Sequence, residues 1–250
     1  MPSYVAPPDA LAGRIILVTG AGSGIGRTAA KTFAAHGATV VLLGRTLAKL
    51  ERVYDEIEAA QGPTPALLPL DLGRAGADDY DGLANTIDKE FGQLDGLLHN
   101  AAVLGALAPI EHYDWDTWNR VLQVNLNAAF LLTRACLPLL KRSADASVVF
   151  TTADVARQGR AYWGAYGACG FAVEGMAQIL AHEVAQNTHI RVNTLDPGAV
   201  RTDLRAQAYP GESPLAHPTP EDIMGTYLYL LGPASRGVTG KALTAERSIL

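Results

Sequence analysis

A glycine-rich turn near the N-terminus has the residue types and spacing of a phosphate-binding loop. It reads Thr19-Gly20-Ala21-Gly22-Ser23-Gly24-Ile25-Gly26, directly after the apolar run 14–19 and at the start of a segment with helical apolar spacing. Glycines let the backbone approach a pyrophosphate, and the free N–H groups of a helix start supply donors and positive dipole. The spacing fits T-G-x-x-x-G-x-G and predicts a dinucleotide site, with a tight turn that binds nothing as the alternative.

The elements that must position this turn alternate between short apolar runs and longer segments with helical periodicity. Candidate strands lie at 14–19, 38–43, 65–70, 94–99, 147–152, 190–195 and, more weakly, 237–245. The helical segments between them are long enough for parallel crossovers, and the runs are apolar on both faces, as in strands covered on each side. The pattern predicts an α/β fold: a Rossmann-type, doubly wound, mostly parallel seven-stranded sheet with helices on both faces.

The domain organisation follows from length and composition. A chain of 250 residues with this alternation is expected to form a single dinucleotide-binding domain over 14–250, preceded by a Pro-rich N-terminal arm over 1–13. The segment 197–220 is the one long irregular stretch, rich in Pro, Gly and Ser. Long loops in compact domains are usually lids or binding loops, and we expect that role here.

Charge, hydropathy and cysteine usage exclude several classes of partner. The formal net charge is −5 and no run of five like charges occurs, which argues against a nucleic-acid partner. The longest apolar stretch, 128–140, contains Thr, Arg and Pro, so no membrane span is predicted. Cys136 and Cys169 are isolated and the histidines lack ligand spacing, so no metal site is expected and the chain is assigned to the cytoplasm.

Several ordered motifs make the chain resemble the short-chain dehydrogenase/reductase family, whose members are single-domain, nicotinamide-dependent oxidoreductases. Besides the glycine turn, these motifs are Asp71-Leu72, His99-Asn100-Ala101-Ala102, Asn125, Tyr166, and Asp196-Pro197-Gly198 leading to Thr202. The match covers nearly the whole chain. The cofactor-binding residues that it implies are Gly20, Ser23, Gly24, Ile25, Gly26, Arg45, Asp71, Leu72, Asn100, Pro197, Gly198 and Thr202.

Within that set the resemblance implies separate roles. The pyrophosphate would be held by Gly20, Gly24 and Gly26. Asp71 would bond the adenine amino group, and Asn100 would line the adenosine ribose. The nicotinamide carboxamide would be cradled by Pro197, Gly198 and Thr202. Taken by itself, Asp71 is better explained as a helix-cap or turn carboxylate.

The end of the second predicted strand bears on cofactor choice. An acidic residue about twenty positions past the glycine turn would bond the ribose 2′-hydroxyl and repel a 2′-phosphate. This chain has Gly44-Arg45-Thr46 there, and a guanidinium suits a 2′-phosphate through charge-assisted hydrogen bonds. We therefore expect NADP(H) in preference to NAD(H), with a solvated Arg45 at a helix start as the alternative.

The catalytic set that the resemblance implies is incomplete. The family has a Tyr as general acid or base, a Lys four residues later that lowers the pKa of the Tyr, a Ser thirteen residues before it, and an Asn that holds a relay water. Tyr166 and Asn125 are present, but the other two positions are Gly170 and Ala153, and no lysine occurs between Lys141 and Lys241. We expect slow chemistry on a carbonyl or alcohol substrate, and Gly170 is expected to leave space beside the ribose.

The candidate substitutes near these positions are Thr151, Thr152, Asp154 and Cys169. Thr152 would need a bulge to take the place of a residue at 153, because adjacent strand residues point to opposite faces. Asp154 is better explained as a loop-capping carboxylate, and Cys169 as a buried inert thiol. The alternatives to a slow enzyme are a catalytically silent NADP(H) sensor or oligomer partner, and a structural subunit without a ligand.

Oligomerisation is also implied by the resemblance. Family members assemble as dimers or tetramers through two long helices, which correspond here to 116–141 and 162–186. Both segments have broad apolar faces, so a homo-dimer or homo-tetramer acting on a small-molecule substrate is expected. The sequence does not name that substrate.

Overall fold

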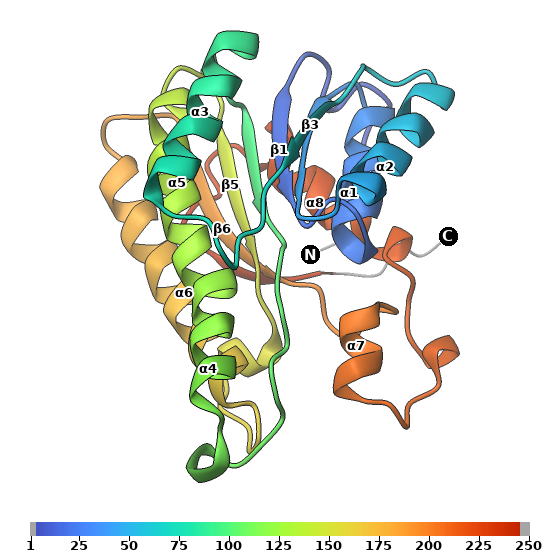
Figure 1. Ribbon diagram of the computed structural model, residues 1–250. Helices are drawn as coiled ribbons and strands as arrows, with labels where there is room; N and C mark the ends of the chain where they lie inside the picture. The colour runs from blue at the N-terminus through green and yellow to red at the C-terminus, as the bar shows by residue number, and fades with distance from the viewer. Residues whose placement is uncertain (1–3, 246–250) are drawn as a thin grey trace.

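The structure, a computed structural model, describes residues 4–245 as one parallel sheet between two layers of helices (Figure 1). The strand order is β3-β2-β1-β4-β5-β6-β7, and every neighbouring pair is parallel. The strands are β1 (Ile15–Thr19), β2 (Thr39–Gly44), β3 (Ala66–Pro69), β4 (Gly96–His99), β5 (Ser147–Thr151), β6 (Arg191–Asp196) and β7 (Ala242–Thr244). The predicted doubly wound sheet is confirmed, although β7 is shorter than the run that predicted it.

Helices cover both faces of the sheet, with α3, α5 and α6 on one side and α1, α2 and α8 on the other (Figure 1). The helices are α1 (Gly24–Ala35), α2 (Leu47–Ala59), α3 (Ala77–Phe91), α4 (Trp115–Leu122), α5 (Ala128–Leu140), α6 (Gly164–Val184), α7 (Asp203–Ala208) and α8 (Met224–Leu231). Alternation along β1 explains the two layers, because Ile16 and Val18 join the apolar cluster on one face while Leu17 joins the cluster on the other.

The strand order reverses at β1, which lies between β2 and β4. In open α/β sheets, ligands bind in the crevice outside the carboxyl ends of the strands at such a point. The predicted glycine turn follows β1 directly, so the topology puts it beside that crevice.

The segment 197–220 is less irregular than predicted. It contains the short helix α7, whose N-cap Thr202 accepts a hydrogen bond at its Oγ1 from the backbone N–H of Arg205 at 3.2 Å. The expectation of an entirely irregular segment is therefore wrong, because a capped turn of helix forms within a Pro- and Gly-rich stretch.

The second half of the predicted N-terminal arm packs against the sheet layers. Leu11 is fully buried in the same apolar cluster as Phe33 and Leu231, and its backbone N–H donates to the carbonyl of His36 at 3.0 Å.

A buried ionic cluster closes the opposite end of the sheet from the crevice. The carboxylate of Asp145 lies 3.1 Å from Nη1 of Arg14, 3.1 Å from Nη2 of Arg191 and 3.4 Å from Nε of Arg236. Arg14 precedes β1 and Arg191 begins β6, so one carboxylate ties the amino ends of distant strands. Asp145 is 8% exposed and Arg191 is 5% exposed, so water compensates little of their charge.

Replacing Asp145→Asn should lower the free energy of unfolding by about 3 kcal/mol, because buried guanidinium groups then lack their anion. Urea denaturation measures this loss. The control is Asp81→Asn, which removes the exposed pair with Arg134 (3.2 Å) and should cost less than about 1 kcal/mol. Equal effects of the two substitutions would contradict a special role for the buried cluster.

Candidate active site

A cavity of about 1100 Å³ lies at the carboxyl ends of the strands and is lined by the segments that follow β1 to β6. It brings together these sequence-predicted residues: Gly20, Ser23, Gly24, Ile25, Arg45, Asp71, Leu72, Asn100, Tyr166, Pro197, Gly198 and Thr202. Gly26 packs behind Gly20, and Asn125 lines a smaller cavity of about 50 Å³ that shares Tyr166 and Thr151 with the large one. The positions agree with the predicted site, and the individual roles stay predictions.

The glycine turn brings the start of α1 close under the end of β1. A Cβ atom at Gly26 would lie 2.3 Å from the carbonyl oxygen of Gly20, so no larger residue fits there. Gly20 and Gly24 have φ angles of 68° and 52°, a region that favours glycine. The N-cap Ser23 makes no side-chain capping hydrogen bond, so it leaves the N–H groups of the first helical turn to a ligand.

Thr19 holds the ends of two neighbouring strands together, a role that sequence analysis did not assign to this residue of the glycine-turn motif. Its Oγ1 accepts hydrogen bonds from the backbone N–H groups of Asn100 at 2.9 Å and Ala101 at 3.0 Å. The Asn100 amide Nδ2 donates to the Thr19 carbonyl at 3.3 Å. A buried threonine as the last residue of a strand before the glycine turn was the available sequence signal.

Three cationic side chains line the cavity near the ends of β2 and β3, which we call its outer end. We call this group the cationic corner: Arg45, Lys49 and Arg74. Arg45 was predicted, whereas Lys49 lies in the first turn of α2 and Arg74 follows the third strand. Asp71 accepts a hydrogen bond from the backbone N–H of Gly73 at 3.0 Å and lies 3.9 Å from Arg74. The turn role that we preferred for Asp71 taken alone is thus present, and the residue also faces the cavity.

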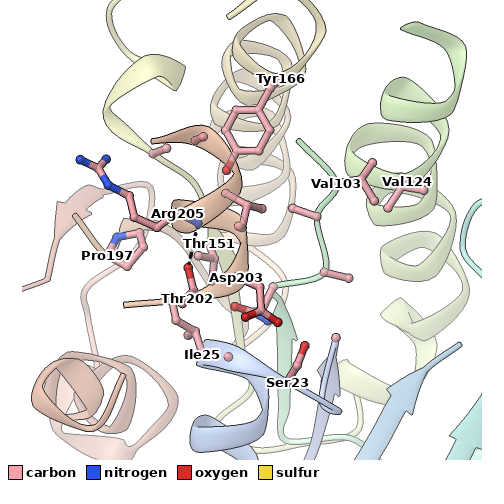
Figure 2. A pocket seen from close by; sticks show the side chains of 18 of the residues that line it. Ser23, Ile25, Val103, Val124, Thr151, Tyr166, Pro197, Thr202, Asp203 and Arg205 are labelled. Carbon is pink, nitrogen blue, oxygen red and sulfur yellow. Dashed lines mark hydrogen bonds between the residues drawn. The ribbon is translucent and has the colours of Figure 1, made fainter. Parts of the chain in front are cut away.

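Tyr166 projects its hydroxyl into the cavity from the first turn of α6 (Figure 2). Trp163 packs edge-on against the phenol ring, with 5.6 Å between ring centroids. Burial, together with the negative charges of Asp196 and Asp154, raises the pKa of Tyr166 to about 12. The phenol is therefore neutral throughout the physiological pH range and can act as a proton donor.

Asn125 lies in a π-helical turn, Gln123–Asn127, that joins α4 to α5. Its Oδ1 accepts from the Val103 backbone N–H at 2.9 Å, and its Nδ2 donates to the Val103 carbonyl at 2.9 Å. The side chain thus fixes the loop after β4. The predicted role in holding a water stays a prediction, and the side-chain amide is already used by Val103.

The space that we expected beside Gly170 is present only as a small cavity that Gly170 lines, because Ala156 occupies the position where a side chain would begin. A Cβ atom at Gly170 would lie 2.5 Å from the Cβ and 3.0 Å from the Cα of Ala156, which belongs to the short turn Asp154–Ala156 after β5. What is left between this turn and α6 is the cavity of about 50 Å³, lined also by Ala153 and Cys169. The turn and the helix pack together where the family has its lysine.

The candidate substitutes for the missing serine and lysine either contact other residues or are unreactive. Thr152 donates its hydroxyl to Glu174 at 2.9 Å, within a buried group that includes Arg157. Asp154 accepts from the Val155 backbone N–H at 2.8 Å and pairs with Arg160 at 2.5 Å. Burial raises the pKa of the Cys169 thiol to about 11, which leaves it inert at neutral pH. The expectations for Asp154 and Cys169 agree with these contacts.

Asp196 is a cavity residue that sequence analysis named only as part of a motif. It is the last residue of β6, it is 7% exposed, and its Oδ1 accepts from the Gly198 backbone N–H at 2.8 Å. Burial raises the pKa of this carboxyl above its ordinary value. The signal in the sequence was an acidic residue directly before Pro197 at the end of a buried strand.

The segment after β6 is fastened across the cavity by Tyr209. Its hydroxyl accepts from Nη1 of Arg160 at 2.9 Å, its ring lies 5.9 Å from that of Trp163, and the Arg205 guanidinium stacks on it at 3.8 Å. Arg205 and Thr202 lie close to Pro197 on this wall (Figure 2). The predicted lid segment therefore contributes a wall of the cavity.

No group of three or more His, Cys, Asp or Glu side chains within residues 4–245 is arranged to hold a metal ion. Nor is any helix of this part of the chain sufficiently long and apolar to cross a membrane.

Because Gly170 packs closely against Ala156, the effects of substitutions at these two positions on the free energy of unfolding should depend on each other. Gly170→Ala should destabilise the protein by about 1–2 kcal/mol, because overpacking against Ala156 outweighs the gain in helix propensity. The same change should cost at least about 1 kcal/mol less in an Ala156→Gly background. Urea denaturation of the four chains gives the coupling directly, and equal costs in both backgrounds would refute the contact.

The chain is similar to known dehydrogenases along its whole length. Residues 14–213 match the short chain dehydrogenase family profile. The uncharacterized oxidoreductase YciK of Escherichia coli K12 is 48% identical, over 97% of this chain and 96% of its own length.

Solved structures agree with this assignment. A short chain dehydrogenase from Pseudomonas syringae superposes with a TM-score of 0.97 at 54% identity and covers 98% of this chain and 100% of its own. A short chain dehydrogenase from Shigella flexneri 2a, complexed with NADP, superposes with a TM-score of 0.93 at 48% identity and covers 95% of this chain and 99% of its own. The resemblance seen in the sequence motifs is confirmed, and the chain belongs to the short-chain dehydrogenase family.

Proposed function

We propose that this protein binds NADP(H) in the large cavity and slowly interconverts a carbonyl and an alcohol in a small-molecule substrate. The observation that carries the proposal is the meeting of the glycine turn, the cationic corner and the Tyr166 hydroxyl in one cavity. The NADP complex of the similar Shigella flexneri protein supports the choice of cofactor.

The residues present fit this cofactor. The close approach of Gly26 to Gly20 leaves a cradle that a Cβ atom would fill, as a backbone site for pyrophosphate requires. Arg45, with Lys49, would hold the 2′-phosphate by charge-assisted hydrogen bonds. Pro197 and Gly198 would receive the nicotinamide end, where the bound cofactor supplies a hydride.

Tyr166 would donate the proton that accompanies carbonyl reduction. With its pKa raised to about 12, only about one molecule in 10⁵ carries a phenolate at pH 7. Neutral Tyr166 suits donation to a carbonyl oxygen, whereas alcohol oxidation requires the rare phenolate. Because no serine stands at Ala153 and no lysine at Gly170, the oxygen lacks a second donor and both directions should be slow.

A second candidate function is a catalytically silent NADP(H)-binding protein, a sensor or an oligomer partner. The packing of Ala156 against Gly170 favours it, because the turn after β5 occupies the space in which a lysine side chain would begin. Cofactor binding is common to both candidates, and turnover separates them.

Assembly and location are part of the same proposal. Phe130 on α5 and Phe171 and Ile179 on α6 are 51%, 47% and 62% exposed, which supports a homo-dimer or homo-tetramer through these helices. Cys136 and Cys169 are buried free thiols, as expected for a protein of the reducing cytoplasm.

The test is NADPH consumption with a panel of reactive carbonyls. The native chain should turn over slowly, and Tyr166→Phe should lower that rate by at least about 10²-fold, since it removes the proton donor. A chain carrying Ala153→Ser, Ala156→Gly and Gly170→Lys should gain about 10²–10³-fold. The Ala156→Gly change makes room for the lysine, which the other two changes alone would not do.

The outcomes separate the candidates. If only the triple variant reacts, the silent binder is the correct function. If Tyr166→Phe retains the native rate, another group donates the proton and the assignment of Tyr166 is wrong. If neither NADPH nor NADP⁺ raises the melting temperature of the native chain, the protein is a structural subunit, since a ligand at ~100 times its dissociation constant stabilises by ~2.7 kcal/mol.

The pH dependence should also reflect the neutral phenol. Tyr166 stays protonated below about pH 12, so the rate of carbonyl reduction should be flat between about pH 6 and 10. Alcohol oxidation should rise about tenfold per pH unit over that range, because the phenolate fraction does. Stopped-flow measurements of both directions provide the check, with the lysine-containing triple variant as comparison. A reduction rate that falls with an apparent pKa near 7 would assign the proton to another group.

A further inference from the structure

The end of the cavity beside β6, which we call its inner end, carries a carboxylate that the proposed reaction does not use. Asp196 stands directly before Pro197 and Gly198, the residues proposed to receive the nicotinamide, and it lines the same cavity as Tyr166. Its Oδ1 is fixed by the Gly198 backbone N–H, so the carboxylate has a defined position. Its negative charge acts on Tyr166, whose pKa it helps to raise.

The other acidic groups near this end have cationic partners. Asp154 pairs with Arg160, and Glu174 pairs with Arg157 at 2.9 Å. Asp196 forms no ion pair within residues 4–245, and Arg157 acts on it only at longer range. The lysine that the family would place four residues after Tyr166 is Gly170, so no ammonium group offsets this charge.

The remaining cations of the cavity either lie away from the proposed nicotinamide position or are paired with a carboxylate. Arg45, Lys49 and Arg74 form the cationic corner at the opposite end, and Arg205 pairs with Glu212 at 2.8 Å. Arg120 lies one helical turn before Val124, which Figure 2 shows across the cavity from Pro197. The charge beside the proposed nicotinamide position is therefore net negative.

We propose that Asp196 makes this site discriminate between the two redox states of the cofactor, so that NADP⁺ binds more tightly than NADPH. The inference rests on the proposed function, namely that NADP(H) occupies the cavity. The two forms differ chiefly in the nicotinamide ring, which is cationic in NADP⁺ and neutral in NADPH. A fixed carboxylate beside that ring stabilises the cation and leaves the neutral ring almost unaffected.

This preference has a consequence for function. A protein that holds the oxidised form preferentially changes its occupancy when the ratio of NADP⁺ to NADPH in the cell changes. It also disfavours binding of the form that carbonyl reduction needs. Both effects suit the sensor role better than rapid catalysis.

Calorimetric titration of the native chain with NADP⁺ and with NADPH at pH 8 tests the inference without turnover. Asp196→Asn should lower the affinity for NADP⁺ relative to NADPH by about tenfold, or about 1.4 kcal/mol. Asparagine keeps the size of the side chain and the acceptor for the Gly198 N–H, so the turn should be retained, and a thermal melt verifies the fold.

The matched control is Asp203→Asn, which neutralises another carboxylate of the same cavity. Figure 2 shows Asp203 toward Ser23, on the side proposed for the pyrophosphate, which is identical in the two forms. This change should alter both affinities by the same factor and leave their ratio unchanged.

The results distinguish the two proposals. If both forms bind and Asp196→Asn leaves their ratio unchanged, or if Asp203→Asn shifts it equally, the role of Asp196 is refuted and the proposed cofactor stands. If neither form binds to the native chain, the proposed function and this inference fall together.

Discussion

The close approach of α1 to the end of β1 is the contact on which the rest of the cavity depends. A Cβ atom at Gly26 would lie 2.3 Å from the Gly20 carbonyl oxygen and 2.6 Å from the Asn100 amide, so only glycine lets the helix start directly under the strand. Thr19 binds the backbone after β4 through the same corner, since its hydroxyl accepts from Asn100 and Ala101. Backbone packing at the reversal of the strand order therefore sets the position of the uncapped helix start.

A second constraint acts at the inner end, where volume and charge change together. The turn Asp154–Ala156 packs against α6 because Gly170 has no side chain, and the same absence removes the cation that would lower the pKa of Tyr166. Burial is the main cause of the raised pKa of the phenol, the charges of Asp196 and Asp154 add to it, and the phenol stays neutral. The close packing of Ala156 and the neutral state of Tyr166 therefore both follow from the absence of a side chain at Gly170.

Sequence analysis predicts the fold well because strands covered on both faces leave uninterrupted apolar runs. The glycine turn is equally readable, since backbone geometry dictates it, and the absence of a lysine at Gly170 follows once the spacing that the family resemblance implies is applied to Tyr166. The close packing of Ala156 at Gly170 was not readable, because it depends on how the turn at Ala156 folds back onto a helix. Helix α7 was missed because its capping residue, Thr202, lies in a segment whose Pro and Gly content predicts a loop.

The roles of several charged residues in the site also could not be predicted from the sequence. Lys49 and Arg74 join Arg45 from three different elements, and in sequence each looks like an ordinary solvated cation. Asp196 is distinguished by three properties together, which the fold creates: its burial, its lack of an ion pair within the described chain and its place on the wall of the cavity.

These charges are distributed unevenly, so that one end of the cavity is positive and the other is negative. Asp154 is neutralised by Arg160, which also holds Tyr209 in the wall of the cavity, so the fastening of that wall uses up one of the two carboxylates near Tyr166. The carboxylate of Asp196 then faces the inner end, and the cationic corner faces the outer end. A ligand with a phosphate at one end and a cationic ring at the other complements both, whereas a ligand whose ring is neutral complements only the corner. The absence of a lysine at Gly170, which we propose slows catalysis, is therefore also what allows this polarity to develop.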